Sequence, residues 1–253
     1  MQGKRGLGSL IAVAALAGSG AVNAATINQG NWGGCLGMTS CVVGDTTITA
    51  LGDAAAAASK NMPVTTSPTL VQQTFNGATG LGIQYARYPN TTLGNSPNLE
   101  IQYSETLNFT FAAPTKIDEL QIVFLYSRER FGSDPAEELA YITGGSTTYT
   151  LTVTDSNNNP PIFGWNGGGT VSAESPYNQG VFKFLNPFGD TLLTSLSLTA
   201  PFLANNTTAD NNDYSFLSLS FTSPPAEVPE PSTYAMMLAG LALLGFMARR
   251  SKA

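Results

Sequence analysis

Residues 106–126 read TLNFTFAAPTKIDELQIVFLY, and this stretch decides the fold. In its first part Leu107, Phe109 and Phe111 alternate with polar residues, which is the two-residue period of a strand with one buried face. From Ile117 to Tyr126 the chain is more continuously apolar, as expected for a strand that is covered on both sides. The stretch therefore predicts β-structure throughout.

Similar segments lie farther along the chain. Tyr149, Leu151 and Val153 alternate with threonines, and residues 192–198 and 214–221 are two further β-like runs. Turn clusters rich in Asn, Gly and Pro separate these runs at roughly 10-residue spacing, and no repeat of about 20 to 50 residues is visible. We therefore predict an all-β fold in which residues 69–223 form an antiparallel β-sandwich with a jelly-roll-like arrangement.

Composition excludes several classes of protein. Only 28 of the 253 residues are charged, so a helical bundle or coiled coil is disfavoured. The chain has no His, which excludes Ser-His-Asp and Cys-His catalysis and His-ligated zinc. The net charge of −6 leaves no basic footprint for nucleic acid.

The N-terminal residues differ chemically from the acidic body, residues 25–228, which carries a net charge of −10. Lys4 and Arg5 precede an apolar run over residues 7–17, and small residues follow up to Ala24. This three-part pattern predicts a signal peptide over residues 1–24 that is cleaved after Ala24. The apolar run is shorter than the roughly 20 residues that a membrane span needs.

The segment 25–68 contains both cysteines of the chain. Cys35 and Cys41 are close in sequence, and an exported protein meets an oxidising environment, so we predict a disulfide between them; free thiols are the alternative. A short helix is predicted between Asp53 and Lys60.

The C-terminal end is a second segment unlike the body. Residues 224–228 form a linker, and the two prolines of Pro229-Glu230-Pro231 mark a boundary that neither a helix nor a central strand can cross. Residues 234–248 carry no charge and predict a single short membrane helix of about 22 Å, thin against a hydrocarbon core of about 30 Å. A basic stop follows: Arg249, Arg250 and Lys252.

This tail resembles the PEP-CTERM sorting signal, also catalogued as the ice-binding-protein C-terminal domain. The resemblance covers residues 229–253 and implies recognition and cleavage by a membrane exosortase. It also implies an inner-membrane-anchored precursor and a mature form at the cell surface or in the extracellular matrix of a Gram-negative, exopolysaccharide-producing bacterium. An ordinary membrane anchor would need neither the Pro-Glu-Pro motif nor so short a helix. A second, looser resemblance places Glu100, Glu105 and Leu107 on a strand module common in exported proteins with this tail.

Candidate chemistry in the body is sparse. Glu100 and Glu105 are a possible carboxylate pair for glycoside hydrolysis, although both fit surface positions at strand ends. Asp213, which follows Asp210, Asn211 and Asn212, is a candidate calcium ligand, although Asp and Asn also favour turns; no other cofactor is predicted. Trp165, in a Gly-rich loop, is a candidate contact for a sugar ligand, and the alternative is that its ring covers an edge of the core. A solvated loop is predicted for the acidic stretch that contains Glu129, Asp134, Glu137 and Glu138.

One further polar pattern bears on function. Thr148, Thr150, Thr152 and Thr154 form a ladder on one strand. A flat ice-binding face would need such ladders over several repeats, and the sequence shows one, so ice binding is not predicted.

Two functions from different classes remain. The first is a non-enzymatic exported protein of the cell surface or exopolysaccharide matrix, a structural component or a weak binder of glycan or other matrix proteins. The second is a secreted carboxylate-based polysaccharide hydrolase. The two sorting signals and the lack of catalytic motifs favour the first, with exosortase as a partner and no nucleic acid.

Overall fold

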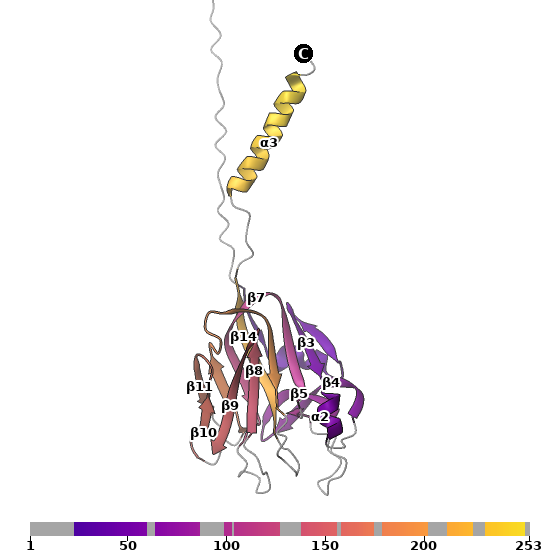
Figure 1. Ribbon diagram of the computed structural model, residues 1–253, viewed down its shortest axis with the longest axis vertical. Coiled ribbons are helices and arrows are strands. Elements are labelled where there is room, and N and C mark those ends of the chain that lie inside the picture. The colour runs from indigo at the N-terminus through magenta and orange to yellow at the C-terminus, as the bar shows by residue number, and fades with distance from the viewer. Residues whose placement is uncertain are drawn as a thin grey trace, which may run out of the picture. The chain divides into compact units, whose positions relative to one another are not determined.

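The structure is a computed structural model, and it describes residues 23–59, 64–86, 99–102, 104–126, 138–155, 158–174, 179–201, 212–224 and 231–250. The chain divides into two compact units, of which Asn23–Pro224 is the larger and the other contains the C-terminal helix. Strands dominate the larger unit (Figure 1). Its elements are β1 (Asn23–Ile27), α1 (Gln29–Trp32), η1 (Gly33–Cys35), β2 (Ser40–Val43), β3 (Thr46–Leu51), α2 (Ala54–Ser59), β4 (Val64–Phe75), β5 (Ala78–Ala86), β6 (Ile101–Gln102), β7 (Thr106–Val123), β8 (Glu138–Gly144), β9 (Thr147–Asp155), β10 (Ile162–Trp165), β11 (Thr170–Ala173), β12 (Phe182–Leu185), β13 (Leu192–Thr199) and β14 (Asp213–Ser223).

The long strand β7 belongs to two sets of strands. Its first half, Thr106–Phe111, pairs with β3 on one side and β13 on the other, and the order continues through β8, β9 and β10. Its second half pairs with β14 and β12, and β14 leads on to β5 and β4. Between the halves Ala112, Ala113 and Pro114 are exposed, and Pro114 has no N–H to give to a ladder. All pairings among the described strands are antiparallel.

These two sets form two layers that face each other. We name β2, β3, the first half of β7, β13, β8, β9 and β10 layer A, and the second half of β7 with β14, β5, β4, β12 and β11 layer B. The rings of Phe109 in layer A and Phe216 in layer B lie 4.8 Å apart, and those of Trp165 and Phe184 also lie 4.8 Å apart. The buried apolar residues of both layers form one core cluster. The predicted all-β antiparallel fold is confirmed.

The sheet extends farther toward the N-terminus than residue 69. β2 and β3 belong to layer A, and β1 pairs with β14, so the strands begin at Asn23. The sequence pattern of β3 does not indicate a strand, because its buried positions include the small or polar residues Ala50 and Thr46 beside Ile48. The helix predicted between Asp53 and Lys60 is present as α2.

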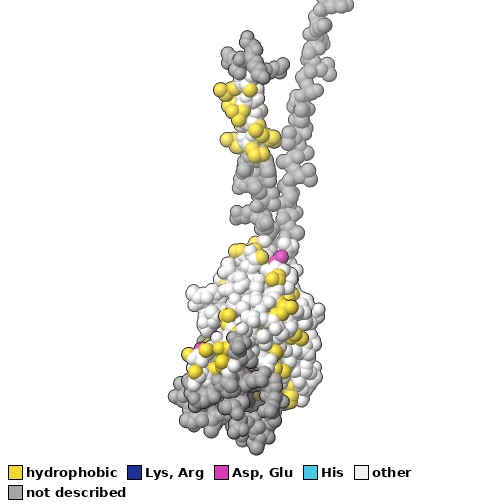
Figure 2. All heavy atoms as spheres, turned by 90° about the vertical axis from the view of Figure 1, so that its right-hand side faces the viewer, with side chains coloured by type: hydrophobic (Ala, Val, Ile, Leu, Met, Phe, Trp, Pro, Cys, Tyr) yellow, Lys and Arg dark blue, Asp and Glu magenta, His cyan; other side chains and the backbone are white. Residues whose placement is uncertain are grey.

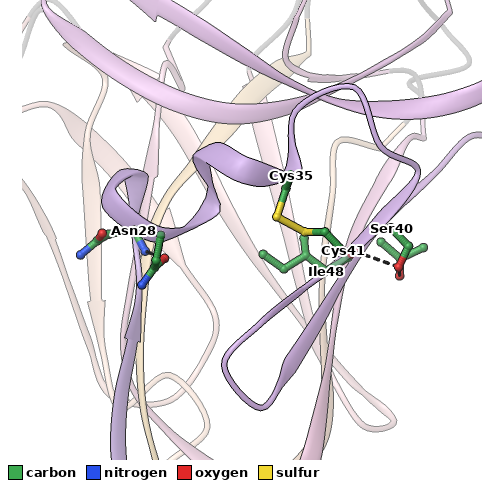
Figure 3. The surroundings of a disulfide bond; sticks show 7 residues. Asn28, Cys35, Ser40, Cys41 and Ile48 are labelled. Carbon is green, nitrogen blue, oxygen red and sulfur yellow. Dashed lines mark hydrogen bonds between the residues drawn. A yellow bond between two sulfur atoms is a disulfide. The ribbon is translucent and has the colours of Figure 1, made fainter.

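The predicted disulfide between Cys35 and Cys41 is present (Figure 3). The loop between the cysteines bonds to both layers: the Gly37 N–H donates to the Leu70 carbonyl of β4 at 2.8 Å, and the Ala50 N–H of β3 donates to the Thr39 carbonyl at 2.8 Å. Gly37 has φ +81°, a conformation that favours glycine. The disulfide therefore closes a loop that joins the layers at one side of the core.

The smaller unit contains α3 (Pro231–Arg250), and the helix predicted for residues 234–248 lies within it. Large apolar side chains of α3 are exposed: Met236, Met237, Leu238, Leu241, Leu243, Leu244 and Met247. Within the described residues, no helix has the length and apolar character needed to cross a membrane.

Candidate functional site

Four buried carboxyl side chains lie where strands of the larger unit begin. Glu100 directly precedes β6, Glu105 directly precedes β7, and Glu138 and Asp213 are the first residues of β8 and β14. Each is less than a tenth exposed. Because charged groups are seldom buried without partners, we expect each of these side chains to have hydrogen-bond partners.

Glu100 and Asp213 form a carboxyl pair. Asp213 pairs in register with Gln102 of β6, which brings Glu100 beside the start of β14, and the two side chains hydrogen-bond to each other. Burial raises the pKa of Glu100 well above its ordinary value, and the negative charge of Asp213 and their hydrogen bond raise it further. The pair therefore shares a proton at a pH where isolated carboxyl groups are ionised.

The other two carboxylates accept hydrogen bonds from backbone amides. Glu105 Oε2 accepts from the Gln102 N–H at 3.1 Å, and Glu138 Oε2 accepts from the Tyr126 N–H. The side chain of Asn212 also bonds to backbone groups: it accepts from the Leu139 N–H at 2.6 Å and donates to the Pro201 carbonyl at 2.7 Å. These groups hold the strand ends in place.

The predicted solvated loop is therefore wrong for Glu138, which is buried at the start of β8. The other members of that acidic stretch lie outside the described residues. The polar sequence around Glu138 gives no hint that its carboxylate accepts a hydrogen bond from the N–H of Tyr126, beyond the end of β7, so sequence reasoning missed it.

The surroundings of Glu100 and Glu105 differ from those of the two carboxyl groups in a glycoside hydrolase. Glycoside hydrolases place two carboxyl groups on either side of a bond in a substrate. Here both carboxyl groups are buried; that of Glu100 hydrogen-bonds to Asp213, and that of Glu105 accepts from the Gln102 N–H. The catalytic use of this pair stays a prediction without support from the geometry.

The calcium ligand predicted at Asp213 also stays a prediction. Asp213 shares its proton-bearing hydrogen bond with Glu100, and its predicted neighbours Asp210 and Asn211 lie outside the described residues. Among the residues that the structure describes, no group of three or more acidic or Cys side chains could hold a metal ion.

Trp165 lies at the edge of the core. Its ring centroid is 4.8 Å from that of Phe184 and 5.5 Å from that of Tyr149, and its Nε1 donates to the Gly168 carbonyl at 2.9 Å. The side chain is half-buried and points into the space between the layers. A sugar could reach only the part of the ring that remains exposed, so the predicted ligand contact stays a prediction.

The sorting residues fall in both described and undescribed segments. Ala24, the predicted cleavage point, lies in β1 opposite Thr222 of β14. Pro229, Glu230 and Lys252 lie outside the described residues, while the backbone of Pro231, Arg249 and Arg250 belongs to α3.

Comparison with known proteins identifies the tail. Residues 227–251 match the PEP-CTERM protein-sorting motif, which implies an exosortase as the processing enzyme. No curated protein and no solved structure matches the chain. The chain therefore carries a PEP-CTERM protein-sorting motif over residues 227–251.

Proposed function

We propose that the chain is an exported, exosortase-processed protein of the cell surface or exopolysaccharide matrix, with a non-enzymatic body that acts as a structural component or binds glycan. The sorting motif at residues 227–251 is the observation that carries this proposal. The body is an antiparallel β-fold whose buried carboxyl groups hydrogen-bond to backbone amides and to each other, which supports a role without turnover. Incubation with polysaccharides should release no sugar.

The tail holds the precursor at the inner membrane until exosortase removes it. The exposed apolar side chains of α3 support this step, because such a surface is stable only when covered by an apolar environment. The signal peptide over residues 1–24 directs export, and cleavage after Ala24 leaves Ala25–Ile27 of β1 paired with β14.

The test replaces Pro229, Glu230 and Pro231 by Ala in the full chain. The apolar helix and its basic stop remain, so the precursor should still reach the inner membrane. Without the Pro-Glu-Pro motif, processing should stop, and a form heavier by up to 25 residues should accumulate in the inner-membrane fraction.

Glu227→Ala, outside the Pro-Glu-Pro triplet, is the matched control and should be processed normally. Immunoblots of membrane and surface fractions give the readout. Normal processing of the triple variant would show that the motif is incidental and that the tail is a plain anchor.

A further inference from the structure

Hydroxyl side chains from five strands, with an Asn from a sixth, line up across the outer face of layer A. β-pairing places the following residues side by side in one row: Ser40, Thr49, Asn108, Ser197, Thr143 and Thr148. None of the six is buried. The single threonine ladder seen in the sequence is therefore one column of a wider array that non-repeated strands assemble.

Two further rows flank the first. One contains Val42, Thr47, Thr110 and Ser195. The other contains Leu51, Thr106, Thr199, Tyr141 and Thr150. We call these three rows the hydroxyl face. Apart from Val42, Leu51, Asn108 and Tyr141, every position in it is Ser or Thr, and none is Asp, Glu, Lys or Arg.

The hydroxyls pair with one another across strands. Oγ atoms lie 2.8 Å apart between Thr106 and Thr199 and 2.9 Å apart between Thr143 and Thr148, and the Ser197 hydroxyl donates to Asn108 Oδ1 at 2.8 Å. A hydroxyl group has one donor and two acceptor sites, so each of the two Thr–Thr pairs keeps one donor and several acceptors for a ligand. These fixed pairs present an ordered pattern of hydrogen-bonding groups.

The lack of charge on this face selects the ligand class. Layer B differs, since its second half of β7 and β12 carry the Lys183–Glu119 ion pair at 2.9 Å. Charged side chains are also sparse on the surface seen in Figure 2. An anionic polymer would find no cation on the hydroxyl face and would meet the net charge of −10 on residues 25–228. A neutral polyhydroxyl ligand fits the face without an electrostatic cost.

Tyr141 supplies an aromatic ring in the same face. It lies between Thr199 and Thr150 in its row and is half-buried, on the side of β8 opposite the core residues Ala140 and Ile142. An aromatic ring can stack on the apolar face of a sugar while neighbouring hydroxyls bond to the sugar hydroxyls.

The twist of a sheet favours a flexible polysaccharide chain over the flat surface of an ice crystal as the ligand of this face. Strands lie about 4.8 Å apart, so the first row extends over roughly 24 Å. Successive strands are rotated by roughly 20° to 25°, so a six-strand row follows a twisted path. A single polysaccharide chain can follow such a path, whereas the flat surface of an ice crystal cannot.

We propose that the hydroxyl face, with Tyr141 within it, binds a neutral polysaccharide chain. This proposal rests on the proposed matrix function and names the surface and the ligand class that the function would use.

The test is affinity electrophoresis of the full-length chain in a neutral detergent. The gels contain hydroxyethyl cellulose or dextran as neutral probes, or alginate as an anionic probe. The wild type should be retarded by at least one neutral polymer and not by alginate. Tyr141→Ala, and separately the double variant Thr106→Val with Thr199→Val, should weaken that binding roughly fivefold or more, as expected for lost hydrogen bonds or stacking.

The matched control is Thr74→Val with Thr79→Val, which removes a similar pair of hydroxyls, 3.0 Å apart, between β4 and β5. Valine suits strands as well as threonine does, so both double variants should fold, and the control should bind like the wild type. Tyr141→Phe keeps the ring and should retain most of the binding.

Several outcomes would overturn the proposal: no retardation by either neutral polymer, stronger retardation by alginate, or equal weakening in the control. Sedimentation that shows self-association lost in the face variants would assign the face to a second copy of the chain and would overturn it too. The assay needs no exosortase, so its failure would leave the sorting result, and thus the proposed export, unaffected.

Discussion

Glu100 and Asp213 bring two carboxyl groups into one hydrogen bond with little solvent around them. Two ionised carboxylates in such a place would repel each other and lose hydration, so the pKa of Glu100 is raised and Glu100 keeps its proton to a higher pH in the folded chain than an isolated glutamate does. The unfolded chain releases that proton at the ordinary pKa of a glutamate. Folding is therefore linked to proton uptake at this residue.

This linkage gives a prediction for Glu100→Gln. Between pH 4.5 and the raised pKa of Glu100, the folded wild type binds more protons than the unfolded chain, so its free energy of unfolding falls as pH rises. Gln keeps a hydrogen bond but cannot ionise. The stability difference should therefore shift in favour of the variant through this window and level off above it.

Urea unfolding of residues 25–226 at a series of pH values measures this difference. Parallel pH profiles for wild type and variant would contradict the prediction, because they would mean that Glu100 has the same pKa folded and unfolded.

At the scale of elements, the loop between Cys35 and Cys41 joins β3 of layer A to β4 of layer B through backbone hydrogen bonds. The disulfide restricts this loop in the unfolded chain more than it adds contacts in the folded one. Its contribution is limited because so few residues separate the cysteines.

We expect the double variant Cys35→Ser with Cys41→Ser to remain folded but to lose about 2 kcal/mol of unfolding free energy. Urea unfolding with and without a reducing agent measures this loss. Reduction should lower the stability of the wild type to that of the variant and leave the variant unchanged. A variant as stable as the oxidised wild type would show that the loop needs no covalent closure.

Some elements could be predicted from the sequence and others could not. β7 and β9 are visible because large apolar residues such as Phe109 and Leu151 occupy their buried positions. β3 is hidden because Thr46 and Ala50 take buried positions that usually hold larger apolar groups. The carboxylate of buried Glu138 accepts from the N–H of Tyr126, twelve residues earlier and beyond the end of β7, and so has no local signature.

The hydroxyl face illustrates the same limit for the candidate site. Alternating threonines in β9 are evident in the sequence, but their alignment with Ser197 and Asn108 depends on register between distant strands. Register is set by the burial of whole strand faces and by turns, and neither can be read from one strand alone.

At the scale of the whole molecule, the larger unit contains the entire described core, from Ile27 to Phe221. Residues 25–226 should therefore fold without either terminal segment, since the strand residues that they omit, Asn23 and Ala24, are exposed. The fragment should be soluble and give a β-type circular dichroism spectrum with a cooperative thermal transition. A mainly helical spectrum, or an unfolded chain, would contradict this prediction.

The position of β14 has a mechanical consequence. β14 ends at Ser223, where the tail begins, and lies between β7 on one side and β6, β5 and β1 on the other. Any tension transmitted through the C-terminal end pulls β14 along its own axis. Interstrand hydrogen bonds run perpendicular to the strands, so this load shears them together and does not peel them apart one at a time. The larger unit should therefore resist unfolding when tension is applied at the C-terminal end of β14.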